Sequence, residues 1–94
     1  MKTLNMNKYG SVLTGREFGK DIMKRIDEEL EPPVVLNFRG VDSLGSSFAD
    51  EVLIPIAKKQ GNSLQICNAT TPVWVCIKDV AQDGGIEVKR GDDE

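Results

Sequence analysis

The sequence of 94 residues contains no histidine, and this absence excludes several kinds of chemistry. Neither a Ser-His-Asp nor a Cys-His catalytic unit can be assembled, and a phosphohistidine relay is impossible. A metal site would also lack its most common side-chain ligand. We therefore expect a protein that is not an enzyme and that needs neither a metal ion nor any other cofactor.

Cysteine, long apolar runs and clustered positive charge are also scarce. Eight residues separate Cys67 from Cys76, which fits neither a CxxC redox pair nor a zinc site, so we expect two reduced, partly buried thiols. No apolar run approaches the roughly 20 residues of a membrane span. The formal charge of −3 and the scattered Lys and Arg argue against nucleic acid as a partner.

The length of the chain and its two ends indicate the number of domains, the location and a possible tail. A chain of 94 residues suffices for one compact domain, which we expect over residues 1–94, but not for two. The first ten residues, MKTLNMNKYG, lack the apolar core of a secretory signal, so the expected location is the cytoplasm. An acidic, flexible tail is expected over about residues 90–94.

The first half of the chain predicts a strand, a helix and a second strand. A weak alternation predicts an edge strand over residues 3–6. Thr14 to Glu17 has the form of a capping box, which predicts a helix start there, and the two prolines at 32 and 33 end that helix. Its buried stripe is expected to contain Phe18, Ile22, Met23, Ile26 and Leu30. The β-rich run at residues 34–38 predicts a central parallel strand.

A second helix is predicted after the loop that contains Gly40. Ser46 or Ser47 is expected to cap it, and Asp50 to place negative charge near the positive end of its dipole. Its inner face should hold apolar residues, Phe48 among them. Pro55 predicts a kink or two short helical pieces, because proline costs about 3 kcal/mol in a regular helix interior.

The last third of the chain is less definite. Gly61 is expected to cap the second helix, and residues 63–67 to form a strand. Thr71 and Pro72 predict a helix start, with a helix to about residue 82 and a turn at 83–85. The inner residues of this helix would be Val73, Ile77, Val80 and Ala81. Residues 73–77 also have strong β composition, so helix and strand both remain open for this segment. Its Trp74 is either a partner contact or part of the core. A last short strand is expected at residues 86–88.

The pattern as a whole predicts an α/β sandwich with helices packed on a mainly parallel sheet. Within it, the strand at 34–38, the Gly40-Val41 loop and the helix start at 47–51, Ser-Phe-Ala-Asp-Glu, resemble the central motif of STAS domains. This is the fold of bacterial anti-sigma-factor antagonists, and the closer resemblance is to a STAS-like family of unknown function. The resemblance extends over about residues 12–61 and implies a small STAS-like sandwich.

The resemblance also implies a non-catalytic regulatory module. Antagonists bind a serine kinase of the histidine-kinase-like ATPase type, an anti-sigma kinase, and are released when a serine at the helix start is phosphorylated. The acceptor position corresponds to Ser46, with Ser47 as second choice. The sequence departs from the antagonist motif at three positions, where Asn37 and Gly45 replace aspartates and Phe48 replaces glycine.

Residues on and after the loop are the candidates for contact with a protein partner. They are Arg39, Asp42, Ser43, Ser46, Ser47 and Asp50. Ser46 can be a helix cap alone or a phosphorylated or partner-covered residue. Two other hypotheses stay open. The helix start can bind a nucleotide or another small anion, or Ser46 can be a nucleophile that takes Lys58 or Lys59 as base, although no spacing places a lysine there.

Overall fold

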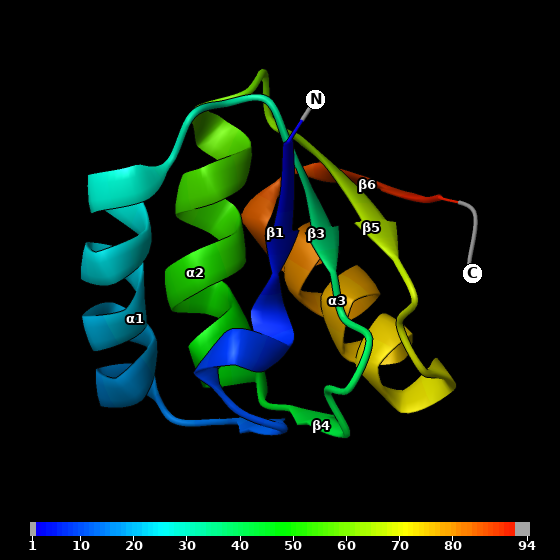
Figure 1. The fold of residues 1–94 in the computed structure, drawn as a ribbon. Coiled ribbons are helices and arrows are strands. Elements are labelled where there is room, and N and C mark those ends of the chain that lie inside the picture. Colours follow the sequence, from blue (N-terminus) through cyan, green and yellow to red (C-terminus); the bar gives the residue numbers. More distant parts are fainter. Residues whose placement is uncertain (1, 92–94) are drawn as a thin grey trace.

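The computed structural model describes residues 2–91, and in that part of the chain a four-stranded parallel sheet is covered by helices (Figure 1). The sheet order is β1 (Lys2–Asn5), β3 (Val34–Asn37), β5 (Ser63–Cys67) and β6 (Glu87–Arg90). The helices are α1 (Arg16–Glu29), α2 (Ser46–Lys58) and α3 (Thr71–Gly84). A short 3-10 helix, η1 (Met6–Tyr9), follows β1, and a second parallel sheet joins β2 (Val12–Leu13) to β4 (Ser43–Leu44). The expected α/β sandwich is confirmed.

All three helices lie on one face of the main sheet. Each connection steps to the next strand in the same direction, and right-handed parallel connections then place their helices on the same side. Burial along the strands agrees, since Leu36 and Ile66 are buried neighbours in the register whereas Gln65 is exposed. The other face carries a mostly polar row of register partners: Thr3, Val35, Gln65 and Lys89.

The core lies between the sheet and the helices, and α1 and α2 approach each other closely. A Cβ on Gly19 would lie 3.0 Å from the Cβ of Glu51 and 3.2 Å from the Cα of Phe48, so a larger residue would crowd this crossing. Phe48 is fully buried, as expected. No polar or charged residue is buried among residues 2–91. The structure therefore holds together by apolar packing, with its charges outside.

The start of α1 differs from the prediction. Gly15, with φ of 96°, occupies the N-cap position and Thr14 does not cap the helix, so the predicted capping box is wrong. Phe18 is 37% exposed rather than buried, because it lies over the outer side of Phe48 with ring centroids 5.5 Å apart. Leu30 is half-buried just past the helix. The buried stripe contains Gly19, Ile22, Met23 and Ile26.

The second helix is one continuous element, so the predicted division at Pro55 is wrong. Six of its residues are buried, and the apolar area that they remove from water outweighs a local cost of about 3 kcal/mol. Gly61 has a left-handed φ of 74° but lies two residues beyond the C-cap, Lys59. The amide of Asn62 returns to the carbonyl oxygen of Ala57 at 2.8 Å and closes this end.

Residues 73–77, for which the sequence allowed either a helix or a strand, lie in the third helix. Residues 71–84 are helical, and the predicted inner residues Val73, Ile77, Val80 and Ala81 are buried. The N-cap is Thr70, one residue before the predicted Thr71, and its hydroxyl accepts from the Val73 amide at 3.4 Å. The predicted turn at 83–85 is wrong, since the helix runs to Gly84 and ends at a left-handed Gly85. This segment forms a helix rather than a strand because its apolar residues recur at the spacing of a helix.

The strands are close to the predicted ones. β5 has the expected bounds, β1 ends one residue earlier because Met6 begins η1, and Phe38 lies buried after β3. The last strand is later than expected and includes Arg90, so the predicted tail cannot begin there. The Gly91 amide donates to Ile66, and residues 92–94 lie outside the described part. In the described part no helix is long and apolar enough to cross a membrane.

Candidate functional site

The start of α2 is capped by backbone rather than by serine. Gly45 occupies the N-cap position, and Ser46 is the first helical residue, so the predicted capping role of the two serines is wrong. The Gly45 amide donates to the Leu13 carbonyl oxygen at 2.8 Å, which holds the loop against the segment before α1. A Cβ at position 45 would lie 3.1 Å from Cγ2 of Thr14. A side chain here would crowd Thr14, which favours glycine at the position where the antagonist motif has aspartate.

The serines are consequently not needed as caps. Ser46 is exposed and Ser47 is half-buried. The first amides of a helix have no acceptor within it, so the N–H groups beside these hydroxyls favour an acceptor or an anion. No acidic residue lies in this first turn, and Asp50 comes later than the prediction assumed. The helix start is thus electrically positive and carries an accessible hydroxyl.

Arg16, at the start of α1, is the residue that sequence reasoning missed. Its Nη1 atom lies 3.1 Å from Oδ2 of Asp50 and 3.6 Å from Oε1 of Glu51. The hydrogen bond that Arg16 donates to Asp50 is the main cause of a raised pKa for the Arg16 guanidinium. Asp50 is 34 positions away from Arg16 along the chain. No local signal pairs two residues at that separation.

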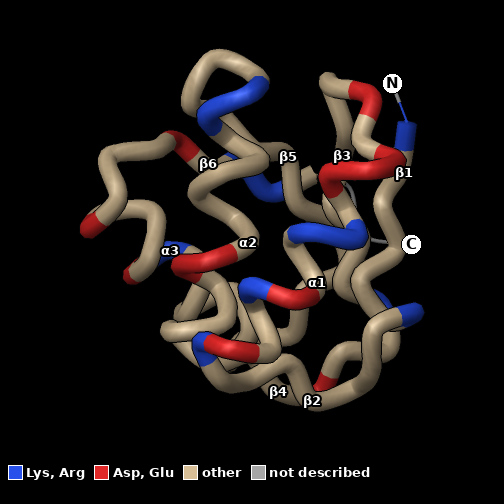
Figure 2. Tube along the Cα trace, turned by 90° about the vertical axis from the view of Figure 1, so that its left-hand side faces the viewer, with Lys and Arg blue, Asp and Glu red and all other residues tan. Residues whose placement is uncertain are grey.

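A surface hollow of about 320 Å³ joins these groups between the three helices. It is lined by Arg16, Ser46, Ser47, Asp50, Val80 and Asp83. One cation therefore faces two carboxylates, and a nucleotide phosphate would meet Asp50 and Asp83 as well as Arg16. The small-anion hypothesis gains little from this arrangement. Figure 2 shows basic and acidic segments interspersed over α1 and α2, which is not the one-sign surface that nucleic acid requires.

The structure divides the six predicted contact residues into two groups. Ser46, Ser47 and Asp50 line the hollow. Arg39, Asp42 and Ser43 do not line it. They are exposed; Arg39 and Asp42 lie on the connection from β3 to β4, and Ser43 is the first residue of β4. The amides of Asp42 and Ser43 both donate to the Ser11 carbonyl oxygen, at 2.7 and 3.2 Å, which fixes this connection beside β2. Five of the six residues are exposed and Ser47 is half-buried, and all six lie between Arg39 and the second turn of α2.

The asparagine at position 37 has a structural explanation. Its amide nitrogen donates to Oδ1 of Asn5 at 3.0 Å, and its Oδ1 accepts from Asn68 at 2.9 Å and from the Arg39 amide at 3.1 Å. These asparagines lie at the ends of three neighbouring strands. An ionised aspartate accepts hydrogen bonds but cannot donate. Asparagine at this position therefore links strand ends in a way that the aspartate of the antagonist motif could not.

The site offers little for catalysis. Lys58 and Lys59 lie at the other end of α2, about 18 Å of helix away from Ser46. Lys59 is paired with Asp27 there. Burial, with a smaller effect of Asp79, raises the pKa of the Cys76 thiol and disfavours its reactive thiolate. No cluster of three potential metal ligands occurs among the described residues.

The fold and this helix start define a class of domain, a two-layer α/β sandwich with parallel connections wound in one direction. A comparison with protein families gives the assignment within that class. The model of a family described as a STAS-like domain of unknown function matches residues 18–74, which is more than half of the chain. The protein belongs to this STAS-like family. The match extends beyond the predicted resemblance and reaches into α3. Comparisons with curated proteins and with solved structures give no significant match.

Proposed function

We propose that this protein is a non-catalytic regulatory module of the bacterial cytoplasm that binds a protein partner through the surface at the start of α2. Membership of a STAS-like family supports a role in protein interaction. The observation that carries the proposal is the exposed Ser46, placed by Gly45 as the first residue of α2 and released from capping. Arg39, Asp42 and Ser43 extend the contact surface along the preceding connection.

The proposed partner is a serine kinase of the histidine-kinase-like ATPase type, and Ser46 is its proposed phosphorylation site. A phosphate would add about −1.5 to −2 charges at neutral pH. The free amides of the first turn and the Arg16 guanidinium would stabilise it, whereas Asp50 and Asp83 would oppose it. The domain can therefore carry the phosphate without refolding. A partner surface shaped around a neutral hydroxyl would have to desolvate a new anion, and binding would be lost.

The test uses a purified ATPase kinase of this type from the same organism. Mass spectrometry after incubation with ATP should find phosphate on Ser46, and Ser46→Ala should abolish it. Ser46→Asp should weaken binding of the kinase by at least about tenfold, as measured by titration calorimetry. Ser47→Ala, the second-choice position, should leave phosphorylation in place.

A matched control is available on α3. Thr71 is exposed and is the first residue of its helix, as Ser46 is in α2. Thr71→Asp therefore adds the same charge at the same helical position on another surface, and should change binding by less than about twofold. Equal effects of Ser46→Asp and Thr71→Asp, or no effect of either, would show that the α2 start is not the interface.

A further inference from the structure

Arg16 and Ser46 belong to different helices but line the same hollow of about 320 Å³. Arg16 is the first residue of α1, and Ser46 is the first residue of α2. Within residues 2–91, Arg16 is the one cation among the residues that line this hollow. A negative charge on the Ser46 side chain would therefore have this guanidinium as its nearest cation in the hollow.

The present partner of Arg16 lies on the same face of α2 as Ser46. Asp50 follows Ser46 by four positions, and residues four apart in a helix are neighbours with Cβ atoms about 5–6 Å apart. Nη1 of Arg16 lies 3.1 Å from Oδ2 of Asp50 and 3.6 Å from Oε1 of Glu51. The guanidinium is therefore bound one helical turn from Ser46, on the face that Ser46 shares.

The ion pair between Arg16 and Asp50 can be exchanged. Its two side chains are 49% and 52% exposed, and ion pairs in contact with water are weak. A phosphoserine carries about −1.5 to −2 charges, so at a similar distance it attracts a guanidinium more strongly than a carboxylate does. The planar guanidinium can also donate two parallel hydrogen bonds to phosphate oxygens. A phosphate on Ser46 would therefore displace Asp50 from Arg16.

A phosphate attached to Ser46 differs from a free anion in this hollow. Asp50 and Asp83 repel both, and a free phosphate or nucleotide can leave for solvent. The phosphate of a phosphoserine is held beside Arg16 by the chain itself, so its local concentration does not depend on its affinity. The carboxylates that disfavour nucleotide binding consequently do not prevent this contact.

We infer, on the basis of the phosphorylation proposed for Ser46, that Arg16 binds the phosphate and changes its partner when Ser46 is modified. Without the phosphate, Arg16 pairs with Asp50. With the phosphate, Arg16 pairs with phosphoserine, and Asp50 is left as an unpaired carboxylate. Phosphorylation then changes the contact surface at two of its predicted residues, Ser46 and Asp50. A bound partner would meet both changes, one helical turn apart.

The test does not need the kinase. Phosphoserine is incorporated at position 46 during synthesis of the full chain, and phosphorus-31 NMR follows its titration between about pH 4 and pH 8. A neighbouring cation stabilises the dianion and lowers the pKa of the phosphate. Arg16→Gln should therefore raise that pKa by about 0.3 to 0.7. Arg16→Lys keeps the charge without the planar fork and should give an intermediate value.

Two matched controls separate this contact from general electrostatics. Lys20→Gln removes a positive charge from the next turn of α1, on a side chain that is 50% exposed and does not line the hollow. It should raise the phosphate pKa by less than about 0.2. Phosphoserine at position 71 places the same group on the exposed first residue of α3. Its pKa should change by less than about 0.1 on Arg16→Gln.

The exchange of partners is tested in the background of Asp50→Asn. A neutral side chain there competes less for the guanidinium, so Arg16→Gln should raise the phosphate pKa by more than it does when Asp50 is present. Nitrogen-15 spectra of the arginine side chains should show that the Arg16 resonances move on phosphorylation. The resonances of Arg25, an exposed residue further along α1, should stay in place. Circular dichroism should show unchanged helix content in every variant.

Several results would overturn the inference. They are the absence of an effect of Arg16→Gln, equal effects of Arg16→Gln and Lys20→Gln, and an equal response of phosphoserine at position 71. An Arg16 effect that is the same with and without Asp50→Asn would contradict the exchange. Failure of the kinase to modify Ser46 would count against the proposed function alone, because the phosphoserine is introduced without it. A kinase that modifies Ser46, combined with no pKa response to Arg16→Gln, would count against the role of Arg16 alone.

Discussion

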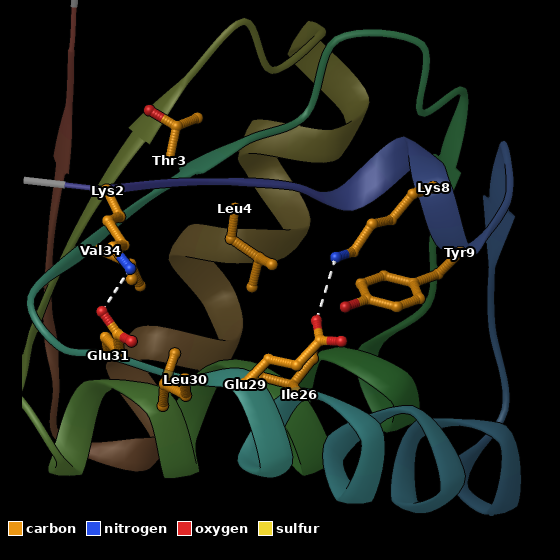
Figure 3. A pocket seen from close by; sticks show the side chains of 10 residues that line it. All are labelled: Lys2, Thr3, Leu4, Lys8, Tyr9, Ile26, Glu29, Leu30, Glu31 and Val34. Carbon is orange, nitrogen blue, oxygen red and sulfur yellow. Dashed lines mark hydrogen bonds and ion pairs between the residues drawn. The ribbon is translucent and has the colours of Figure 1, made fainter.

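The two ends of α1 differ in how closely the chain packs around them. At its start, α1 meets α2 so closely that a Cβ on Gly19 would lie only 3.2 Å from the backbone of Phe48. At its end, the helix separates from β1 and leaves a hollow of about 160 Å³ rimmed by exposed ion pairs (Figure 3). The packed end holds Ser46 and Arg16 on a fixed frame. The open end offers space and the outer edge of β1, which pairs only with β3 within residues 2–91. The difference shows that one helix can be closely packed at one end and loosely packed at the other.

The largest effect should come from removing the buried ring at the packed end. Phe48→Ala should lower the free energy of unfolding by about 3–5 kcal/mol, because Phe48 is fully buried. Phe18→Ala removes the ring that lies against it, but Phe18 is 37% exposed and the loss should stay below about 2 kcal/mol. Urea denaturation measures both. Equal losses would mean that the two rings are packed alike and that the start of α1 is more closed than the structure shows.

The glycine at the crossing should show the next effect. Gly19→Ala should destabilise by about 1–3 kcal/mol although alanine favours helix, because the new methyl group meets the backbone of Phe48. Gly84→Ala meets Ile54 mainly at its terminal Cδ1, which can rotate, so its cost should be smaller. Thermal unfolding of the two variants measures which substitution destabilises the protein more. A stabilised Gly19→Ala would show that α1 and α2 can separate freely.

A truncation at the open end should cost less than one at the packed end. Leu30 is half-buried beside the hollow, and Leu30→Ala should destabilise by about 1–2 kcal/mol. The contrast with Phe48→Ala is the prediction, measured by urea denaturation under the same conditions. A loss as large as that of Phe48→Ala would show that the residues around this hollow are packed as closely as the core.

The smallest effect concerns pH at the open end. The hydrogen bond from Lys2 lowers the pKa of Glu31. A carboxyl with a lowered folded-state pKa stabilises the fold above its unfolded pKa, and this contribution is lost as pH falls through the folded-state pKa. Wild type should therefore melt slightly above Glu31→Gln at neutral pH, and the two should converge by about pH 3. Lys2→Met should remove the same difference. A difference that persists in acid would mean that another group causes it.

Prediction from the sequence succeeded where the spacing of residues within one segment is enough to specify its secondary structure. The strand at 63–67 and the inner residues of α3 follow from spacing alone, and both are confirmed. Prediction failed at helix starts, where Thr14, Ser46 and Ser47 have the right chemistry for caps but glycines occupy the N-cap positions. At Gly45 the reason is contact with Thr14, a residue far away in sequence. At this position the contact with the segment that contains Thr14 outweighs the local preference for a capping side chain.

The sequence by itself determined the class of structure and the chemistry that is absent. Its periodicities specify helices and strands that alternate along the chain, and a chain without histidine cannot form the common histidine-dependent sites. Only the tertiary structure decided that Arg16 meets Asp50, that Ser46 is released from capping, and that the end of α1 leaves a groove beside β1. The physical reason is that periodicity is a property of neighbouring residues, whereas ion pairs and close contacts depend on how distant segments pack.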